Sequence, residues 1–141
     1  MVSKQVHGTS VAIENRGVLI IGSSGSGKSD LALRLIDSGA TLISDDQTEC
    51  IKNKNDIFLF PNQEICGLIE VRGVGIIKVP FVKNVKLNMI VELTNKEPER
   101  IPESKKKRLL GKNIKYIKII GTEPSASAKI KVKLLEDMIN D

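Results

Sequence analysis

The sequence predicts a mixed α/β fold built around a helix that follows a phosphate-binding loop. Three observations lead to this prediction. The apolar run at residues 18–21 is typical of a buried strand, a glycine-rich stretch follows at residues 22–29, and residues 30–37 have the apolar spacing of an amphipathic helix. The other apolar segments are mostly short and extended, so a mixed sheet with few helices is favoured over a simple doubly wound sheet.

The glycine-rich stretch fits the pattern G-x-x-x-x-G-K-[ST] of phosphate-binding loops in nucleoside-triphosphate enzymes. Its glycines allow several N–H groups to approach phosphate oxygens, and the positive end of the next helix points the same way. The lysine can reach the β- and γ-phosphates, and the final serine can bind Mg²⁺. The predicted nucleotide-binding residues are Gly22, Ser23, Ser24, Gly25, Ser26, Gly27, Lys28 and Ser29. The alternative is a surface turn before an ordinary helix.

Length and composition limit the class of protein. The 141 residues are most simply one domain, residues 1–141, with a core of Ile, Leu and Val, because 40% of residues are hydrophobic and only 3% are aromatic. No apolar run approaches the ~20 residues that span a membrane, and the first residues lack a signal-peptide segment. We therefore expect a soluble, cytoplasmic protein with no membrane partner. Cys50 and Cys66 lack metal-site spacing and are expected to be reduced thiols.

Charge is unevenly distributed along the chain. Residues 1–70 contain six basic and nine acidic residues, whereas residues 71–141 contain sixteen and eight. A lysine-rich solvated surface explains this better than a binding face for an acidic partner or a nucleotide, although the second interpretation stays open. Nucleic acid is not expected as a partner, because Tyr116 is the only aromatic residue in the basic stretch that could stack on bases.

The remaining elements follow from apolar patterning and turn residues. A hairpin is expected from residues 11–13 and 18–21, and a second one from residues 48–52 and 57–60. Residues 94–104 hold two prolines and several charges, which is typical of a loop. Further strands are expected at residues 41–43, 76–79, 87–93 and 116–120, a short helical turn at 105–110, and a last helix at 126–139.

Two carboxylates follow the predicted strand at residues 41–43, namely Asp45 and Asp46. At a strand end, one helix after a phosphate loop, carboxylates suit Mg²⁺ binding or the removal of a proton from an attacking hydroxyl, although aspartate is also common in plain turns. Glu70 and Arg72 share a face if their segment is extended. Gly73 and Gly75 beside them indicate close approach of the main chain to another group. An exposed ion pair is the alternative there.

Together these segments resemble the catalytic domain of the HPr kinase/phosphorylase family. The match runs over roughly residues 5 to 100 and consists, in order, of His7-Gly8, the phosphate loop, Asp45-Asp46 and Glu70-Val71-Arg72-Gly73-Val74-Gly75. The resemblance implies a P-loop, phosphoenolpyruvate-carboxykinase-like fold. It also implies a protein serine kinase that uses ATP and Mg²⁺ and phosphorylates HPr, the phosphocarrier of the sugar phosphotransferase system, and so regulates carbon metabolism.

The resemblance also implies a role for each matching residue near the phosphate loop. Lys28 would hold the transferring phosphate and Ser29 the Mg²⁺. Asp45 would be the base that takes the proton of the serine, and Asp46 would help with the metal or with positioning. His7 would lie near the two aspartates, although a lone histidine is more often structural or exposed.

Further along the chain, the implied roles concern the metal and the substrate. Glu70 would be a metal-linked group, with Arg72, Gly73 and Gly75 in a loop that faces the substrate. Arg100 corresponds to a further catalytic arginine of the family.

The chain departs from the family pattern in three places. The residues match neither the family's usual N-terminal domain nor its full C-terminal part, so we expect a short form with the catalytic domain only, and homo-oligomerisation stays open. Residues 123–128 replace a Pro-Gly-Arg-Asn type loop used in dephosphorylation. We therefore expect kinase activity to outweigh phosphorolysis. The alternative functions are a P-loop small-molecule kinase and a nucleotide-responsive regulatory module without turnover.

Overall fold

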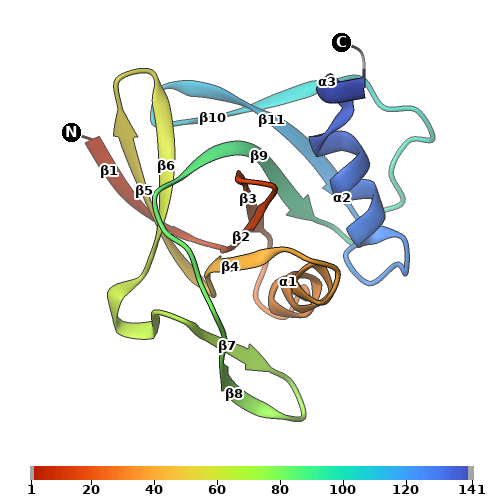
Figure 1. The fold of residues 1–141 in the computed structure, drawn as a ribbon. Helices are drawn as coiled ribbons and strands as arrows, with labels where there is room; N and C mark the ends of the chain where they lie inside the picture. The colour runs from red at the N-terminus through yellow and green to blue at the C-terminus, as the bar shows by residue number, and fades with distance from the viewer. Residues whose placement is uncertain (1, 140–141) are drawn as a thin grey trace.

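The structure is a computed structural model that describes residues 2–139. Strands dominate it, and two longer helices lie on one side of the central strands (Figure 1). In chain order the elements are β1 (Val2–His7), β2 (Thr9–Ile13), β3 (Arg16–Ile21), α1 (Lys28–Asp37), β4 (Thr41–Ser44), β5 (Gln47–Asn53), β6 (Asp56–Pro61), the 3-10 helix η1 (Gln63–Ile65), β7 (Leu68–Val71), β8 (Gly75–Lys78), β9 (Val85–Leu93), β10 (Lys105–Leu109), β11 (Lys112–Ile119), α2 (Ala126–Leu134) and α3 (Glu136–Ile139).

The central sheet is mixed, as predicted. Strands β3, β9 and β11 are parallel neighbours, β2 pairs antiparallel with β3, and β4 pairs antiparallel with β2. The first residues of β9 also pair with β6, which continues through β5 to β1. The carboxyl ends of β3, β9 and β11 therefore meet at one edge of the sheet, where ligands bind in open sheets of this kind.

Side chains alternate between two cores on opposite faces of the sheet. In β3, Val18 and Ile20 face the helices, where they pack with Leu31 and Leu35 of α1 and with Ile130 of α2. Leu19 between them points to the other face and packs with the β5–β6 hairpin. Each strand residue thus serves one core only, because successive side chains point to opposite faces. This double burial explains why residues 18–21 form an unbroken apolar run.

Strands β7 and β8 form a separate hairpin that extends away from the central sheet (Figure 1). Its turn closes through a hydrogen bond from the N–H of Val74 to the carbonyl of Val71, 2.9 Å long. Val74 and Ile76 are exposed there.

Most predicted elements are confirmed, and three differences are found. The prediction of a helical turn at residues 105–110 is wrong, because this segment is strand β10, paired antiparallel with β11. Leu110 and Gly111 connect the two strands with φ values of 49° and 80°, and two adjacent residues with positive φ make the tight turn that suits a hairpin. Strand β1 was not predicted, because most of its side chains are exposed and show no apolar alternation.

The predicted last helix ends earlier than expected. Helix α2 stops at Leu134, and Leu135 forms the turn before the short helix α3. Over residues 2–139 no helix is both long and apolar enough to cross a membrane. Both cysteines are free thiols, as expected, and burial raises the pKa of the Cys50 thiol to about 12.

Candidate active site

The glycine-rich loop connects β3 to α1, as the motif predicted. Gly25 and Gly27 have φ values of 79° and 97°, a region that side-chain-bearing residues rarely adopt. At Gly22 a side chain would also collide, because an added Cβ would lie 2.8 Å from Ser26 Oγ and 3.3 Å from Leu93 Cβ. The conformation of this loop therefore depends on glycine at all three positions.

Lys28 is the first residue of α1, and its side chain folds back over the loop. Its Nζ donates hydrogen bonds to the carbonyls of Gly22 at 2.9 Å and Ser23 at 3.0 Å, and the residue is buried. Gly27 is the N-cap of α1 and makes no side-chain cap, so no side chain competes for the first N–H groups of the helix. An ammonium group and free helix N–H groups together form an environment suited to an anion.

Ser29 contacts the first of the two aspartates. Its Oγ donates to Asp45 Oδ1 at 2.6 Å, and Thr9 Oγ1 donates to the same oxygen at 3.1 Å. The main-chain N–H of Glu70 donates to Asp45 Oδ2 at 2.9 Å. Asp45 is only 6% exposed, so these three donors fix the orientation of a carboxylate that has little access to solvent.

Asp46 points elsewhere and contacts His7, as the resemblance implied. His7 Nε2 lies 2.9 Å from Asp46 Oδ1, and the two side chains are 49% and 61% exposed. The backbone of Asp46 has a φ of 65°, which turns its side chain away from that of Asp45. Neighbouring carboxylates in the sequence thus occupy two environments, one buried beside Ser29 and one open to solvent beside His7.

Thr9 is a site residue that sequence reasoning missed. Besides its bond to Asp45, its Oγ1 accepts a hydrogen bond from the main-chain N–H of Asp46 at 3.1 Å, and the residue is fully buried. It therefore ties both aspartates to the start of β2. The sequence feature that could have identified Thr9 is its position directly after His7-Gly8, at the start of a buried strand.

The segment from Glu70 to Gly75 forms the end of β7 and the turn into β8. Gly73 and Gly75 have φ values of 84° and 132°, and an added Cβ at either would meet nothing within 4 Å. These glycines therefore serve the turn and do not mark a close approach within the chain. The side chains of Glu70 and Arg72 are exposed and form no ion pair in the part of the chain that the structure describes.

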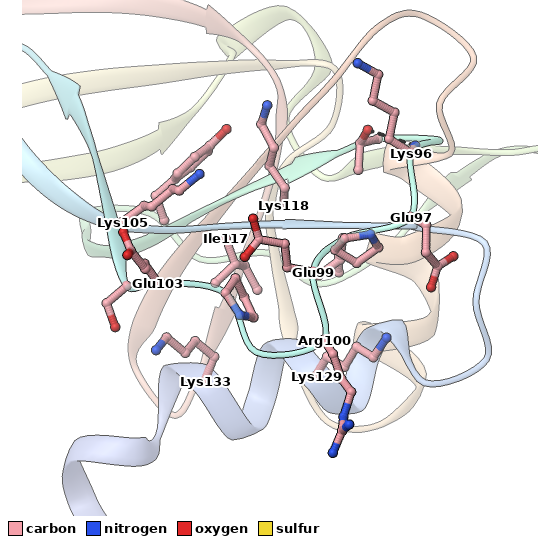
Figure 2. Close-up of a pocket in the computed structure, with 16 residues that line it drawn as sticks. Lys96, Glu97, Glu99, Arg100, Glu103, Lys105, Ile117, Lys118, Lys129 and Lys133 are labelled. Carbon is pink, nitrogen blue, oxygen red and sulfur yellow. Dashed lines mark hydrogen bonds between the residues drawn. The ribbon is translucent and has the colours of Figure 1, made fainter.

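Arg100 lies apart from the contacts of Ser29 and the aspartates. It is exposed in the loop between β9 and β10 and lines a cavity formed with β11 and α2 (Figure 2). Within residues 2–139 it makes no hydrogen bond or ion pair with the other predicted site residues.

The oxygen atoms beside the loop can contribute to a Mg²⁺ site without forming a complete one. Among the described residues, no group of three or more His, Cys, Asp or Glu side chains is arranged to hold a metal. The hydroxyl of Ser29 and the carboxylate of Asp45 are hard oxygen ligands side by side, and Mg²⁺ is often bound by one or two protein oxygens, with phosphates and water completing its shell. Of the other predicted ligands, Asp46 contacts His7 instead, and Glu70 reaches Asp45 through its main-chain N–H while its side chain is exposed.

The structure is a mixed α/β protein in which a glycine-rich loop precedes helix α1, and comparison with known proteins identifies its family. Residues 1–137 match the family model for the HPr Serine kinase C-terminal domain, and the chain belongs to this family.

Curated relatives and a solved structure agree with this assignment. The chain is 40% identical over 119 residues to an HPr kinase/phosphorylase of Mycoplasmopsis pulmonis, covering 79% of this chain and 38% of that protein. It is 37% identical over 126 residues to that of Brevibacillus brevis, covering 84% and 39%. The structure of the Hpr(Ser) kinase/phosphatase from Coxiella burnetii matches 97% of each chain with a TM-score of 0.84 and 25% identity. The chain thus spans about two fifths of the length of these curated relatives.

Proposed function

We propose that this chain is the catalytic unit of an ATP-dependent protein serine kinase that phosphorylates HPr and thereby regulates sugar uptake and carbon metabolism. The observation that carries the proposal is the 2.6 Å hydrogen bond between Ser29 and Asp45 beside the folded-back Lys28. It places a hydroxyl, a carboxylate and an ammonium group around one anion-binding loop, as phosphoryl transfer requires. Family membership supports HPr as the acceptor.

The reaction is phosphoryl transfer from ATP to a serine hydroxyl. The serine oxygen forms a bond to the γ-phosphorus, the bond from that phosphorus to the β-phosphate oxygen breaks, and the serine proton passes to a carboxylate. Lys28 and the loop N–H groups stabilise charge on the phosphate oxygens. Ser29 and Asp45 are the protein groups that would hold Mg²⁺, which would supply neutralisation of phosphate charge.

The contacts favour a division of roles between the aspartates that reverses the sequence-based expectation. Asp45 accepts three hydrogen bonds within the chain and is buried, which suits orienting Ser29 and the metal. Asp46 is open to solvent and has His7 at 2.9 Å, which suits contact with an incoming hydroxyl. We therefore assign the base role to Asp46 and the role near the metal to Asp45, with His7 orienting the Asp46 carboxylate.

The β7–β8 hairpin is the part of the chain that we assign to the acceptor protein. Arg72, Gly73 and Gly75 lie in its exposed turn, and the N–H of Glu70 at its base is bonded to Asp45. This connection joins the hairpin to the site where transfer takes place. We also propose that Glu70 lies near the metal and acts through its main-chain N–H, which donates to Asp45.

Residues 123–128 support a preference for the forward reaction. They contain no arginine. The segment leads from the turn after β11 into α2, and the carbonyl of Glu123, before the helix, accepts a hydrogen bond from Arg34. A segment held in this way presents no additional cation to an attacking inorganic phosphate. We expect phosphorolysis of serine-phosphorylated HPr to be slower than its formation.

Incubation with γ-labelled ATP tests the function. The purified chain should transfer label to HPr and not to a panel of small alcohols and sugars, and Lys28→Ala should reduce transfer by about 10²-fold or more. Lys54→Ala, at an exposed hairpin tip, is the matched control and should leave transfer unchanged. Label on a small molecule would indicate a small-molecule kinase, and ATP binding without any product would indicate a regulatory module.

A further inference from the structure

A cavity of about 710 Å³ lies between the β9–β10 loop, β11 and α2 (Figure 2). Its volume lies within the range of small-molecule sites, about 300–1,000 Å³. Three carboxylates line it, from Glu97, Glu99 and Glu103. Six basic residues also line it, namely Lys96, Arg100, Lys105, Lys118, Lys129 and Lys133.

The cavity begins beside the glycine-rich loop. Leu93, the last residue of β9, is the residue that a Cβ on Gly22 would meet at 3.3 Å. Thr94 follows it, lines the cavity, and donates its N–H to the carbonyl of Ile119 at 2.9 Å. Consecutive Cα atoms are about 3.8 Å apart. Thr94, which lines the cavity, is therefore the direct neighbour of a residue that lies against the glycine-rich loop.

The strand order places this cavity and the aspartates on opposite sides of the loop. From β3, the sheet continues through β9 to β11 on one side and through β2 to β4 on the other. Asp45 follows β4 and accepts the hydrogen bond of Ser29. A nucleotide whose terminal phosphate faces Ser29 and Asp45 would therefore extend its other end toward β9 and β11.

We propose that the cavity binds the ribose and base of the nucleoside triphosphate whose phosphates lie on the glycine-rich loop. This inference rests on the proposed function. The carboxylates accept hydrogen bonds, as ribose hydroxyls require, and Glu99 and Glu103 come from the loop between β9 and β10, which lines the cavity together with Ile117 of β11 (Figure 2). Pro98 and Ile117 supply apolar surface for a base.

The charges of the lining fit a nucleoside better than a second polyanion. Lys129 is paired with Glu123 at 2.6 Å, and Lys133 with Glu136 at 3.1 Å, so two of the basic residues are already neutralised. The four other basic residues face three glutamates, so the charges of the lining nearly balance and offer a separate phosphate-rich ligand little net attraction. A neutral ribose and base need no net positive charge and can use the same carboxylates as acceptors.

Calorimetric binding of ATP and of inorganic tripolyphosphate tests the inference, because tripolyphosphate has no nucleoside. The informative variant combines Glu97→Gln, Glu99→Gln and Glu103→Gln, all on exposed residues. The control combines Glu14→Gln, Asp37→Asn and Glu49→Gln, which removes as many negative charges from residues that do not line the cavity. We expect ATP to bind more tightly than tripolyphosphate, and the triple variant to weaken ATP by about tenfold without weakening tripolyphosphate.

Equal affinity of the wild-type chain for ATP and tripolyphosphate would overturn the nucleoside site and leave the loop as a phosphate site. An unchanged ATP affinity in the triple variant, or an equal loss in the control, would overturn it as well. Absence of binding by both ligands would overturn the proposed function itself, so the two failures are distinguishable.

Discussion

At the scale of single residues, the two adjacent aspartates have different surroundings. Asp45 is 6% exposed and receives three hydrogen bonds, whereas Asp46 is open to solvent and contacts only His7 through its side chain among the described residues. A backbone φ of 65° at Asp46 separates the two side chains. One carboxylate is therefore suited to holding a serine and a cation, and the other to meeting an incoming hydroxyl.

Substitution of each aspartate should separate these roles. Asp46→Asn should lower kcat for HPr phosphorylation by about 10²-fold or more with ATP affinity retained, because the proton acceptor is lost. Asp45→Asn should instead raise the Mg²⁺ concentration needed for half-maximal rate. Steady-state rates across a Mg²⁺ titration measure both effects. A normal kcat in Asp46→Asn together with a lost kcat in Asp45→Asn would restore the original assignment.

Thr9 should act as a positioning residue for both aspartates. Thr9→Val removes a donor to the buried Asp45 carboxylate and the acceptor of the Asp46 N–H, which costs about 1–3 kcal/mol of unfolding free energy. Thr9→Ser keeps the hydroxyl and should retain most of the stability and of the transfer rate. Urea unfolding and HPr phosphorylation measured on both variants check this. Equal behaviour of the valine and serine variants would exclude a role for the hydroxyl.

At the scale of elements, the β5–β6 and β10–β11 hairpins are joined by an ion pair. Lys112 donates to the carboxylate of Asp56, and Lys86 lies 3.5 Å from the same carboxylate. The hydrogen bond from Lys112 holds the pKa of Asp56 below its usual value of 3.8. A carboxyl group with a lowered pKa stabilises the folded state above that value and loses the contribution as the pH falls through the folded-state pKa.

The pH dependence of stability should reveal this pair. Asp56→Asn should lower the melting temperature at neutral pH by a small amount, because the pair is partly exposed to solvent. The difference from wild type should disappear at a pH well below 3.8, where Asp56 is protonated in both states. Thermal melts from neutral to acidic pH measure it. A difference that persists unchanged in acid would show that the carboxylate charge is not responsible.

The sequence predicted the elements whose pattern is local. Residues 18–21 and the glycine motif identified β3, the loop and α1, because buried strands and phosphate loops have distinctive local composition. Strand β1 was not predicted because it is an exposed edge strand. Strand β10 was not predicted because its sequence is mostly basic, and its extended conformation depends on pairing with β11. Thr9 was not predicted as a site residue, because its contact with Asp45 joins residues 36 positions apart and exists only in the folded chain.

At the scale of the whole molecule, the mixed sheet arranges three regions along one edge. The cavity lies beyond β9, the glycine-rich loop follows β3, and the aspartates follow β4 on the far side. The β7–β8 hairpin extends from the aspartate side, where its first strand is bonded to Asp45. Under the proposed function, this order would provide a nucleoside end, a phosphate centre and an acceptor end along one edge of the sheet.

The most direct test of this arrangement is mass spectrometry of HPr after incubation with the purified chain, ATP and Mg²⁺. The proposed function predicts that HPr gains one phosphoryl group, that peptide mapping places it on a serine, and that Lys28→Ala slows the gain by about 10²-fold or more. HPr that keeps its original mass under conditions where the wild-type chain binds ATP, or that is modified on a residue other than serine, would contradict it.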